Sequence, residues 1–204
     1  MSWNKFNLYN LAHRALPPQT SRKTLFQQRW EAKRLTRGYH GDHLTERQWQ
    51  RLFNAGGRAT SSTLPSLTFA ALERRLEVAV FRCLFAPSVM AAHQMIRHGA
   101  VQVNEKKMLY PSYRLKDGDM ITVDPDAIPM LKRGESPKEP HTYTPRDYSQ
   151  PFHFLPDYLE VDYATCSAVF LREPVARPGR SEIPSPYPPH THQLAYEFYV
   201  RKRG

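Results

Sequence analysis

The sequence predicts an α+β protein with a helical N-terminal part, a small helix–helix–strand module, an extended N-terminal arm and proline-rich loops. Three observations predict this class. Apolar residues recur at helical spacing in the first half of the chain. Short runs of alternating β-branched residues follow Gly99. Seven of the 18 prolines fall within residues 124–156, where large aliphatic residues are scarce, so we expect no compact unit there.

The N-terminal third is expected to be an arm followed by helices. Residues 1–28 are basic and are expected to be extended, and residues 29–69 form a helical segment that Gly38 and Gly41 interrupt. A helix should begin in the run TERQWQRLF, because Thr45 and the glutamine three residues later fit a capping box. Its buried face carries Trp49, Leu52 and Phe53, and a glycine pair ends it at Gly56 and Gly57.

Residues 70–124 are expected to form the helix–helix–strand module. Apolar spacing predicts one helix from Phe69 to Phe85. Ser88 is placed to cap a second helix, from Val89 to His98, which Gly99 ends in the left-handed conformation. Short strands then follow at 101–103, 106–107 and 120–123, with turns at 104–105 and 117–119.

The rest of the chain is expected to be irregular and then strand-like. Residues 125–156 predict a proline-rich connection over the surface. Residues 157–204 form a C-terminal segment in which Tyr158–Leu171 and Gln193–Val200 resemble strands.

The charge indicates a polyanionic partner. The formal net charge is +10, which favours nucleic acid first and an anionic membrane surface second. No apolar run approaches the roughly 20 residues of a spanning helix, so we expect no membrane partner. Residues 1–69 carry net +8, residues 70–123 net +3 and residues 124–204 net −1. The first two-thirds of the chain therefore carry the basic surface.

The cysteines and the N-terminus bear on the compartment. Cys83 and Cys166, the two cysteines of the chain, cannot form a disulfide framework or a four-cysteine zinc site, and a reducing compartment is favoured. We expect Cys83 to be buried on the apolar side of its helix. The first 30 residues hold five lysines and arginines and no acidic residue. A mitochondrial transit peptide and an arm that threads into RNA fit that composition equally well.

The candidate RNA contacts are cations and hydrogen-bonding groups on the polar face of the module. Arginine binds phosphate oxygens bidentately, lysine acts as a point charge, and the free amides at a helix start accept a phosphate. A tyrosine could stack on a base or close the core. Together the candidates are Arg74, Arg75, Arg82, Ser88, His93, Arg97, His98, Lys106, Lys107, Tyr113 and Arg114.

These residues also have interpretations that involve no RNA. Single arginines also serve as the solvated face of a helix, and His93 and His98 are five apart, which is poor spacing for a shared metal. The pair His190 and His192 lies among prolines and is expected to be a plain loop.

Nothing in the sequence predicts an enzyme. It has no glycine-rich phosphate loop, nucleophile elbow or metal-binding helix motif. Asp117 and Asp119 flank a turn glycine, so their carboxylates should bond backbone amides. We expect no catalysis, cofactor, metal or small-molecule substrate.

The runs LERRLEVAVFRCLFAP and HQMIRHGAVQVNEKKMLYPSYRLKDGDMITV resemble the RNA-binding domain of the small-subunit ribosomal protein S-four family. The flanks resemble it too: residues 29–55 its first helical segment, and LPDYLEVDYATCSAVFLREP with LAYEFYVRK its C-terminal segment. The resemblance implies a structural protein that binds small-subunit rRNA, supports subunit assembly and lies near the channel through which mRNA enters, beside other ribosomal proteins. It also implies that the module is inserted into a helical domain, onto which residues 157–204 pack back.

Departures from the family indicate an organellar member. Val89 stands where the family has a basic residue, His93 where it has arginine, Glu105 where it has a turn glycine and Ala100 where it has a histidine, while Arg97 adds a cation. The N-terminal zinc cysteines of some relatives are absent. With the acid-free N-terminus, these changes favour a mitochondrial protein of fungal style; a bacterial cytoplasmic one is the alternative address. A free RNA-binding rescue or assembly factor is the alternative function.

Overall fold

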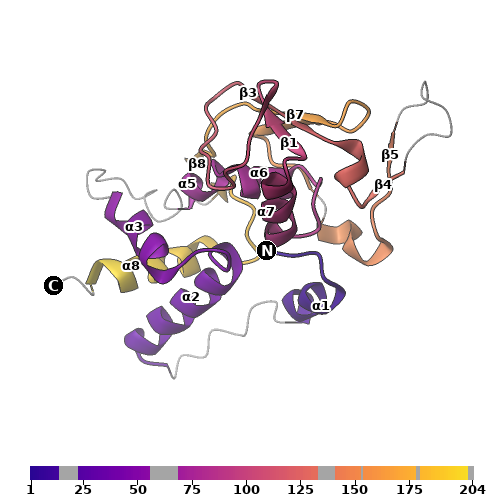
Figure 1. Ribbon diagram of the computed structural model, residues 1–204. Helices are drawn as coiled ribbons and strands as arrows, with labels where there is room; N and C mark the ends of the chain where they lie inside the picture. The colour runs from indigo at the N-terminus through magenta and orange to yellow at the C-terminus, as the bar shows by residue number, and fades with distance from the viewer. Residues whose placement is uncertain (14–22, 56–68, 133–140, 153, 178–179, 202–204) are drawn as a thin grey trace. The chain divides into compact units, whose positions relative to one another are not determined.

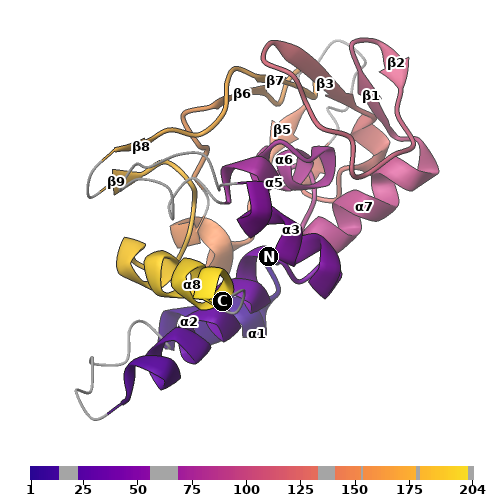
Figure 2. The same ribbon diagram turned by 90° about the vertical axis from the view of Figure 1, so that its left-hand side faces the viewer.

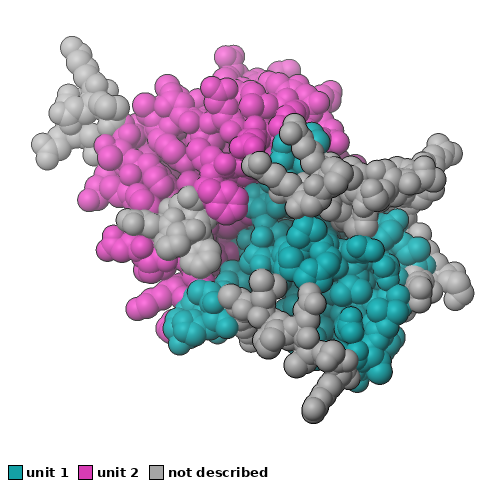
Figure 3. Space-filling model, turned by 180° about the vertical axis from the view of Figure 1, so that it is seen from behind, with its two compact units in different colours: residues 1, 9–72, 174–204 teal, residues 2–8, 73–173 magenta. Residues whose placement is uncertain are grey.

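The structure, a computed structural model, describes residues 1–13, 23–55, 69–132, 141–152, 154–177 and 180–201 (Figures 1 and 2). The chain forms two compact units (Figure 3). Unit 1 comprises Met1 and residues 9–72 and 174–204, and unit 2 comprises residues 2–8 and 73–173. The fold is α+β, as the sequence predicted. Within the described residues, no helix has both the length and the apolar character needed to cross a membrane.

Unit 1 is mainly helical. Its longest helices are α2 (Leu25–His40) and α8 (Pro189–Arg201), which lie side by side in both ribbon views, with α3 (Glu46–Ala55) next to them. Unit 1 also contains most of the short α5 (Ala70–Glu73) and a two-stranded ribbon, β8 (Ala176–Arg177) and β9 (Arg180–Ser181). The buried core is aromatic and comprises Leu44, Trp49, Phe53, Phe69, Ala70, Leu72, Ile183 and Tyr199.

The helix boundaries of unit 1 follow local signals. A capping box between Thr24 and Gln27 starts α2. The predicted interruption at Gly38 is wrong, because α2 runs through it, but the helix does end at Gly41. A Cβ on Gly41 would lie 2.3 Å from the Trp49 ring, so glycine lets this ring pack directly on the turn. The predicted break at Gly56–Gly57 lies outside the described residues.

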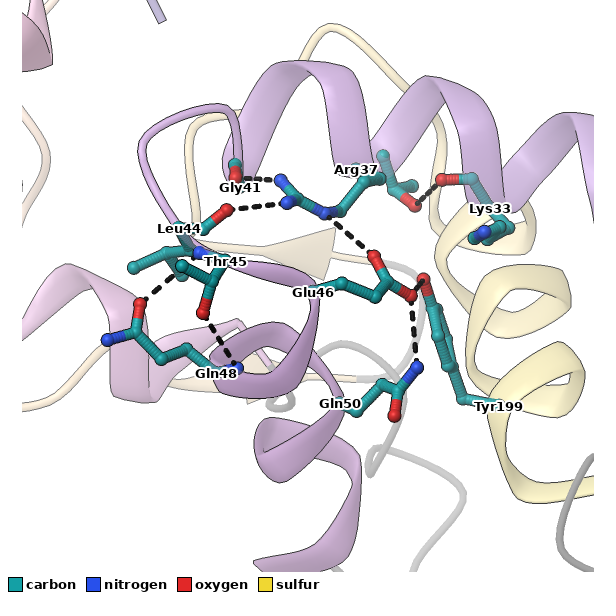
Figure 4. Close-up of polar contacts among 10 residues, drawn as sticks. Lys33, Arg37, Gly41, Leu44, Thr45, Glu46, Gln48, Gln50 and Tyr199 are labelled. Carbon is teal, nitrogen blue, oxygen red and sulfur yellow. Dashed lines mark hydrogen bonds and ion pairs between the residues drawn. The ribbon is translucent and has the colours of Figure 1, made fainter.

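A polar network joins the helices of unit 1 (Figure 4). Thr45 and Gln48 make the predicted capping box of α3, with side chain to backbone distances of 3.2 and 3.4 Å. Arg37 of α2 donates to Glu46 at 3.3 Å and to the carbonyls of Gly41 and Leu44. Glu46 also accepts from Tyr199 of α8 at 3.4 Å, and hydrogen bonds and the nearby cations lower the pKa of Glu46 against the opposing effect of burial, which is the largest single influence.

Unit 2 packs two helices on an antiparallel sheet. The helices are α6 (Leu76–Arg82) and α7 (Val89–His98). The five strands lie in the order β2 (Lys106–Lys107), β1 (Val101–Val103), β3 (Asp119–Val123), β7 (Ser167–Phe170) and β6 (Leu159–Asp162). The register pairs Val103 with Ile121 and Ile121 with Ala168, which aligns buried residues on one face.

Most local predictions for the module are confirmed. Helix 89–98 is found as predicted, and Gly99 follows it with φ +79°. Asn104 and Glu105 form the turn with φ of 49° and 65°. Cys83 is fully buried, and burial raises the pKa of its thiol. The single helix predicted from Phe69 to Phe85 is wrong, because the backbone at Arg75 is extended (ψ 132°) and separates α5 from α6.

The arm and the connection contain more regular structure than expected. Residues 5–13 of the predicted extended arm form a helix, α1 (Lys5–His13), and Trp3 packs on Phe81 with ring centroids 5.0 Å apart. In the described part of 125–156 the structure has only short elements: η1 (Pro125–Ala127), β4 (Leu131–Lys132), β5 (Thr142–Tyr143) and η2 (Asp147–Phe152).

The C-terminal segment is shared between the units. Residues 159–170 form the predicted strands, but these extend the sheet of unit 2, and only residues 174–204 belong to unit 1. The strand predicted at Gln193–Val200 is wrong, because this stretch lies in α8. Its buried positions, Thr191, His192, Ala195 and Tyr199, follow the helical period.

Candidate nucleic-acid interface

Arg82 is bound inside unit 2. Its side chain is 6% exposed, and its Nε and Nη2 donate to the two carboxylate oxygens of Glu73 at 2.9 and 3.0 Å. The hydroxyl of Tyr158 donates to the same carboxylate at 2.9 Å, and burial, with the charge of Glu73, raises the pKa of Tyr158. Because the guanidinium is buried and bidentate, Arg82 serves the core of unit 2, and we leave it out of the candidate RNA surface.

Arg74 also serves the fold. Its Nε donates to the carbonyl of Leu115 at 2.9 Å, its Nη2 pairs with Asp117 at 2.9 Å, and its Nη1 pairs with Glu173. These bonds tie the start of unit 2 to its last residue. All three nitrogens of the guanidinium therefore have partners within unit 2, which gives Arg74 a structural role there. Of the two turn aspartates, Asp119 accepts a hydrogen bond from the Lys116 backbone amide at 2.8 Å, as predicted, whereas Asp117 pairs with Arg74.

A buried carboxylate holds two of the predicted contacts. Glu77 is 1% exposed, accepts from Nε of Arg75 at 2.8 Å and lies 2.9 Å from Nδ1 of His93. His93 is nearly half exposed and Arg75 about one-fifth exposed. Glu77 therefore fixes one side of each residue and leaves the remaining polar atoms for a ligand. Sequence reasoning missed Glu77, although its position two residues after Arg75, on the apolar side of α6, was a usable signal.

Ser88 and Tyr113 have local roles. The Ser88 hydroxyl accepts from the Ala91 amide at 3.0 Å, which confirms the predicted cap. Ser2 forms an antiparallel bridge with Ser88, so the start of α7 lies against the N-terminal residues of unit 2. Tyr113 is half-buried against the core, and its carbonyl accepts from the Leu76 amide at 2.9 Å. Of the two interpretations of Tyr113, the structure favours closing the core.

The remaining candidates are exposed and basic. They are Arg97, His98, Lys106, Lys107 and Arg114. The Lys107 side chain lies over Gly99 at the end of α7, because a Cβ on that glycine would meet Lys107 carbon atoms.

Five of these residues are connected along one run of elements, which we call the basic strip: Arg114, Arg75, His93, Arg97 and Lys107. Arg114 forms a backbone bridge with Arg75. Glu77 joins Arg75 to His93, and Arg97 follows His93 by one helical turn. Lys107 then covers the end of the same helix. The strip brings together basic side chains from the residue before α6, from α7 and from the strand region.

The pair predicted as a plain loop lies instead in α8, where His190 is exposed and His192 is part of a buried cluster. His192 lies in α8 with 2% exposure, and its Nε2 is 3.0 Å from the Ser185 hydroxyl, which also lies 3.0 Å from Nε2 of His40. Burial lowers the pKa of His192 to about 4. Among the described residues, no group of three or more histidine, cysteine, aspartate or glutamate side chains is arranged to hold a metal ion.

The two helices and the first strands of the sheet in unit 2 fall within a recognised class of domain. The S4 domain model matches residues 74–121. Small ribosomal subunit protein uS4m of Schizosaccharomyces pombe is 35% identical over 255 aligned residues, which cover 100% of this chain and 78% of the relative. Small ribosomal subunit protein uS4 of Ruegeria sp. is 37% identical over 170 residues (83% and 74%), and that of Ruegeria pomeroyi 41% over 143 residues (70% and 63%). The chain belongs to the small ribosomal subunit protein uS4 family.

Proposed function

We propose that this protein is a structural constituent of the small subunit of the mitochondrial ribosome. The observation that carries this proposal is the likeness to the Schizosaccharomyces pombe protein, which spans the whole of this chain and bears a mitochondrial name. The relatives from Ruegeria align with 83% and 70% of it. The role is structural rather than catalytic: the protein binds small-subunit rRNA and supports subunit assembly and translation.

The RNA contact of unit 2 is the basic strip, together with its exposed neighbours His98 and Lys106. Glu77 favours this assignment because it orients Arg75 and His93 without covering them. The other partners are neighbouring small-subunit proteins, with mRNA close to the place where it enters the subunit. We infer these RNA, protein and mRNA partners from the membership of the chain in the uS4 family.

Salt dependence tests the strip. Arg97 and Lys107 are exposed, so replacing both with alanine should leave the fold intact. Each lost phosphate contact should flatten the log–log salt dependence of binding to a small-subunit rRNA transcript by about 0.7–0.9 units. Lys132→Ala, an equally exposed cation on the β4–β5 hairpin, is the matched control. An unchanged slope in the double variant would show that the strip is not the RNA face.

Crosslinking in native cells tests residence and compartment. The tagged protein is purified under denaturing conditions and the attached RNA is sequenced. Reads concentrated on mitochondrial small-subunit rRNA support the proposal. Reads on bacterial-type cytoplasmic rRNA would support the ribosomal role but assign the protein to the bacterial cytoplasm instead of the mitochondrion. Reads scattered over tRNA and many transcripts would replace the resident role with that of a free RNA-binding factor.

A further inference from the structure

Three aromatic side chains form a partly exposed cluster on α2 and α8 of unit 1, which we call the aromatic platform: Phe26, Trp30 and Phe198. Phe26 is 65% exposed and Trp30 50% exposed. The ring centroids of Phe26 and Trp30 are 6.4 Å apart at 25°, and the Phe198 ring lies 5.6 Å from Trp30, nearly edge-on. Phe26 and Trp30 are therefore the solvent-accessible rings of the platform, whereas Phe198 is partly buried against the core of unit 1.

Two cations of α2, Lys33 and Arg34, accompany the platform. The Lys33 ammonium lies 4.8 Å from the Trp30 ring centroid and 5.5 Å from that of Phe198. Arg34, the next residue of α2, is exposed. Residues 23–40 contain five lysines and arginines and one glutamate.

The carboxylates near the platform are already neutralised. Glu31 pairs with Lys23 at 2.5 Å, and Glu197 pairs with Arg29 at 2.8 Å. Neither carboxylate is therefore an unopposed negative charge that would repel phosphate. Lys33, which also interacts electrostatically with Glu46, and the exposed Arg34 are the cations that the platform offers to phosphate.

We propose that the aromatic platform binds unpaired nucleotides of an RNA strand, with bases stacked on Trp30 and Phe26 and phosphates held by Lys33 and Arg34. Stacking of a base on an exposed aromatic ring, beside a cationic track for the backbone, is the chemistry of single-strand binding. A protein partner would also suit aromatic residues, but it would need an acidic surface for the same two cations. The platform adds a second RNA contact, on unit 1, and does not depend on which RNA the basic strip binds.

Trp30 supplies a direct readout. Trp3 and Trp49 are buried, at 5% and 0% exposure, so a quencher from solvent acts mainly on Trp30. The full chain is titrated with an unstructured oligouridine or oligoadenosine of about 12 nucleotides and, separately, with a duplex RNA of equal length. We expect the single strand to quench the tryptophan fluorescence and the duplex to do so much less, because its bases are already stacked.

Variants separate stacking from charge. Trp30→Ala should weaken single-strand binding by about tenfold with an unchanged salt slope, whereas Lys33→Ala should lower the slope by about 0.7 units. Phe154→Ala, at a residue of unit 2 that is 56% exposed, is the matched aromatic control and should bind like the wild type. Circular dichroism and thermal unfolding should be the same for all three variants.

Two results would overturn the proposal. One is wild-type affinity for the single strand in the Trp30→Ala variant. The other comes from crosslinking the Trp30→Ala variant in native cells. If this variant loses crosslinks to a ribosomal protein but keeps its crosslinks to RNA, the platform is a protein-docking surface. The quenching titration is repeated with the Arg97→Ala plus Lys107→Ala variant. This variant separates RNA binding by the basic strip from RNA binding by the aromatic platform. Quenching that persists there supports the platform, and quenching that disappears assigns the signal to unit 2.

Discussion

Replacing Arg82 with methionine should destabilise unit 2 without acting on RNA directly. Methionine keeps an unbranched apolar stem but removes the guanidinium, so the Glu73 carboxylate stays buried with the Tyr158 hydroxyl and loses its bidentate partner. Breaking a buried ion pair on one side costs about 3–5 kcal/mol. Glu73→Gln retains an oxygen for Tyr158, so the double variant should lose less stability than the sum of the two single variants.

Amide hydrogen exchange in the full-length chain measures this effect within unit 2. The Val123 amide, at the end of the central strand β3, donates to the Cys166 carbonyl at 3.0 Å, and its exchange reports the opening free energy of that unit. We expect faster exchange at Val123 in the Arg82→Met variant and partial recovery in the double variant. Unchanged exchange, combined with a salt slope of RNA binding lower by about one unit, would refute the structural role and make Arg82 an RNA contact.

Three further predictions concern single residues. Gly99→Ala should destabilise unit 2 by about 1–2 kcal/mol, because φ is +79° there, and should weaken RNA binding by displacing Lys107; denaturation and binding titrations check both. Burial, with a smaller contribution from His190, lowers the pKa of His192 from 6.5 to about 4. As the pH falls, the unfolded chain therefore takes up a proton at this histidine before the folded chain does. The free energy of unfolding should decrease as the pH falls from 6.5 to 4, by at most about 3 kcal/mol. Denaturation of a His192→Gln variant should show a smaller fall over that range. Thr45→Ala should cost unit 1 about 1 kcal/mol in thermal unfolding, while Thr45→Ser should retain most of the cap.

Features set by neighbouring residues were predictable from the sequence. Ser88, the apolar spacing of α7 and Gly99 together define that helix because cap, period and left-handed stop act within one turn of each other. The S-four resemblance was confirmed through the same stretch and its flanks. In these places local preference and tertiary structure agree.

Features set by residues far away in the sequence were not predictable from the sequence. Arg82 looked like any arginine on a polar helix face, and what buries it is Glu73, nine residues earlier, with Tyr158 from another part of the chain. Residues 193–200 alternate in a way that suits a strand, but the core of unit 1 requires a helix there to bury Ala195 and Tyr199 together. Tertiary packing overrode the local pattern in both cases.

The division of unit 1 between two stretches of chain has a consequence for synthesis. A ribosome makes α2 and α3 early, but Trp49 and Phe53 share their core with Ile183 and Tyr199, which emerge only near the end of translation. The strands of unit 2 all precede residue 174, so that unit has its whole sheet sooner. The part of the molecule that is started first is thus completed last, and its aromatic residues stay uncovered in the nascent chain until the final helix arrives.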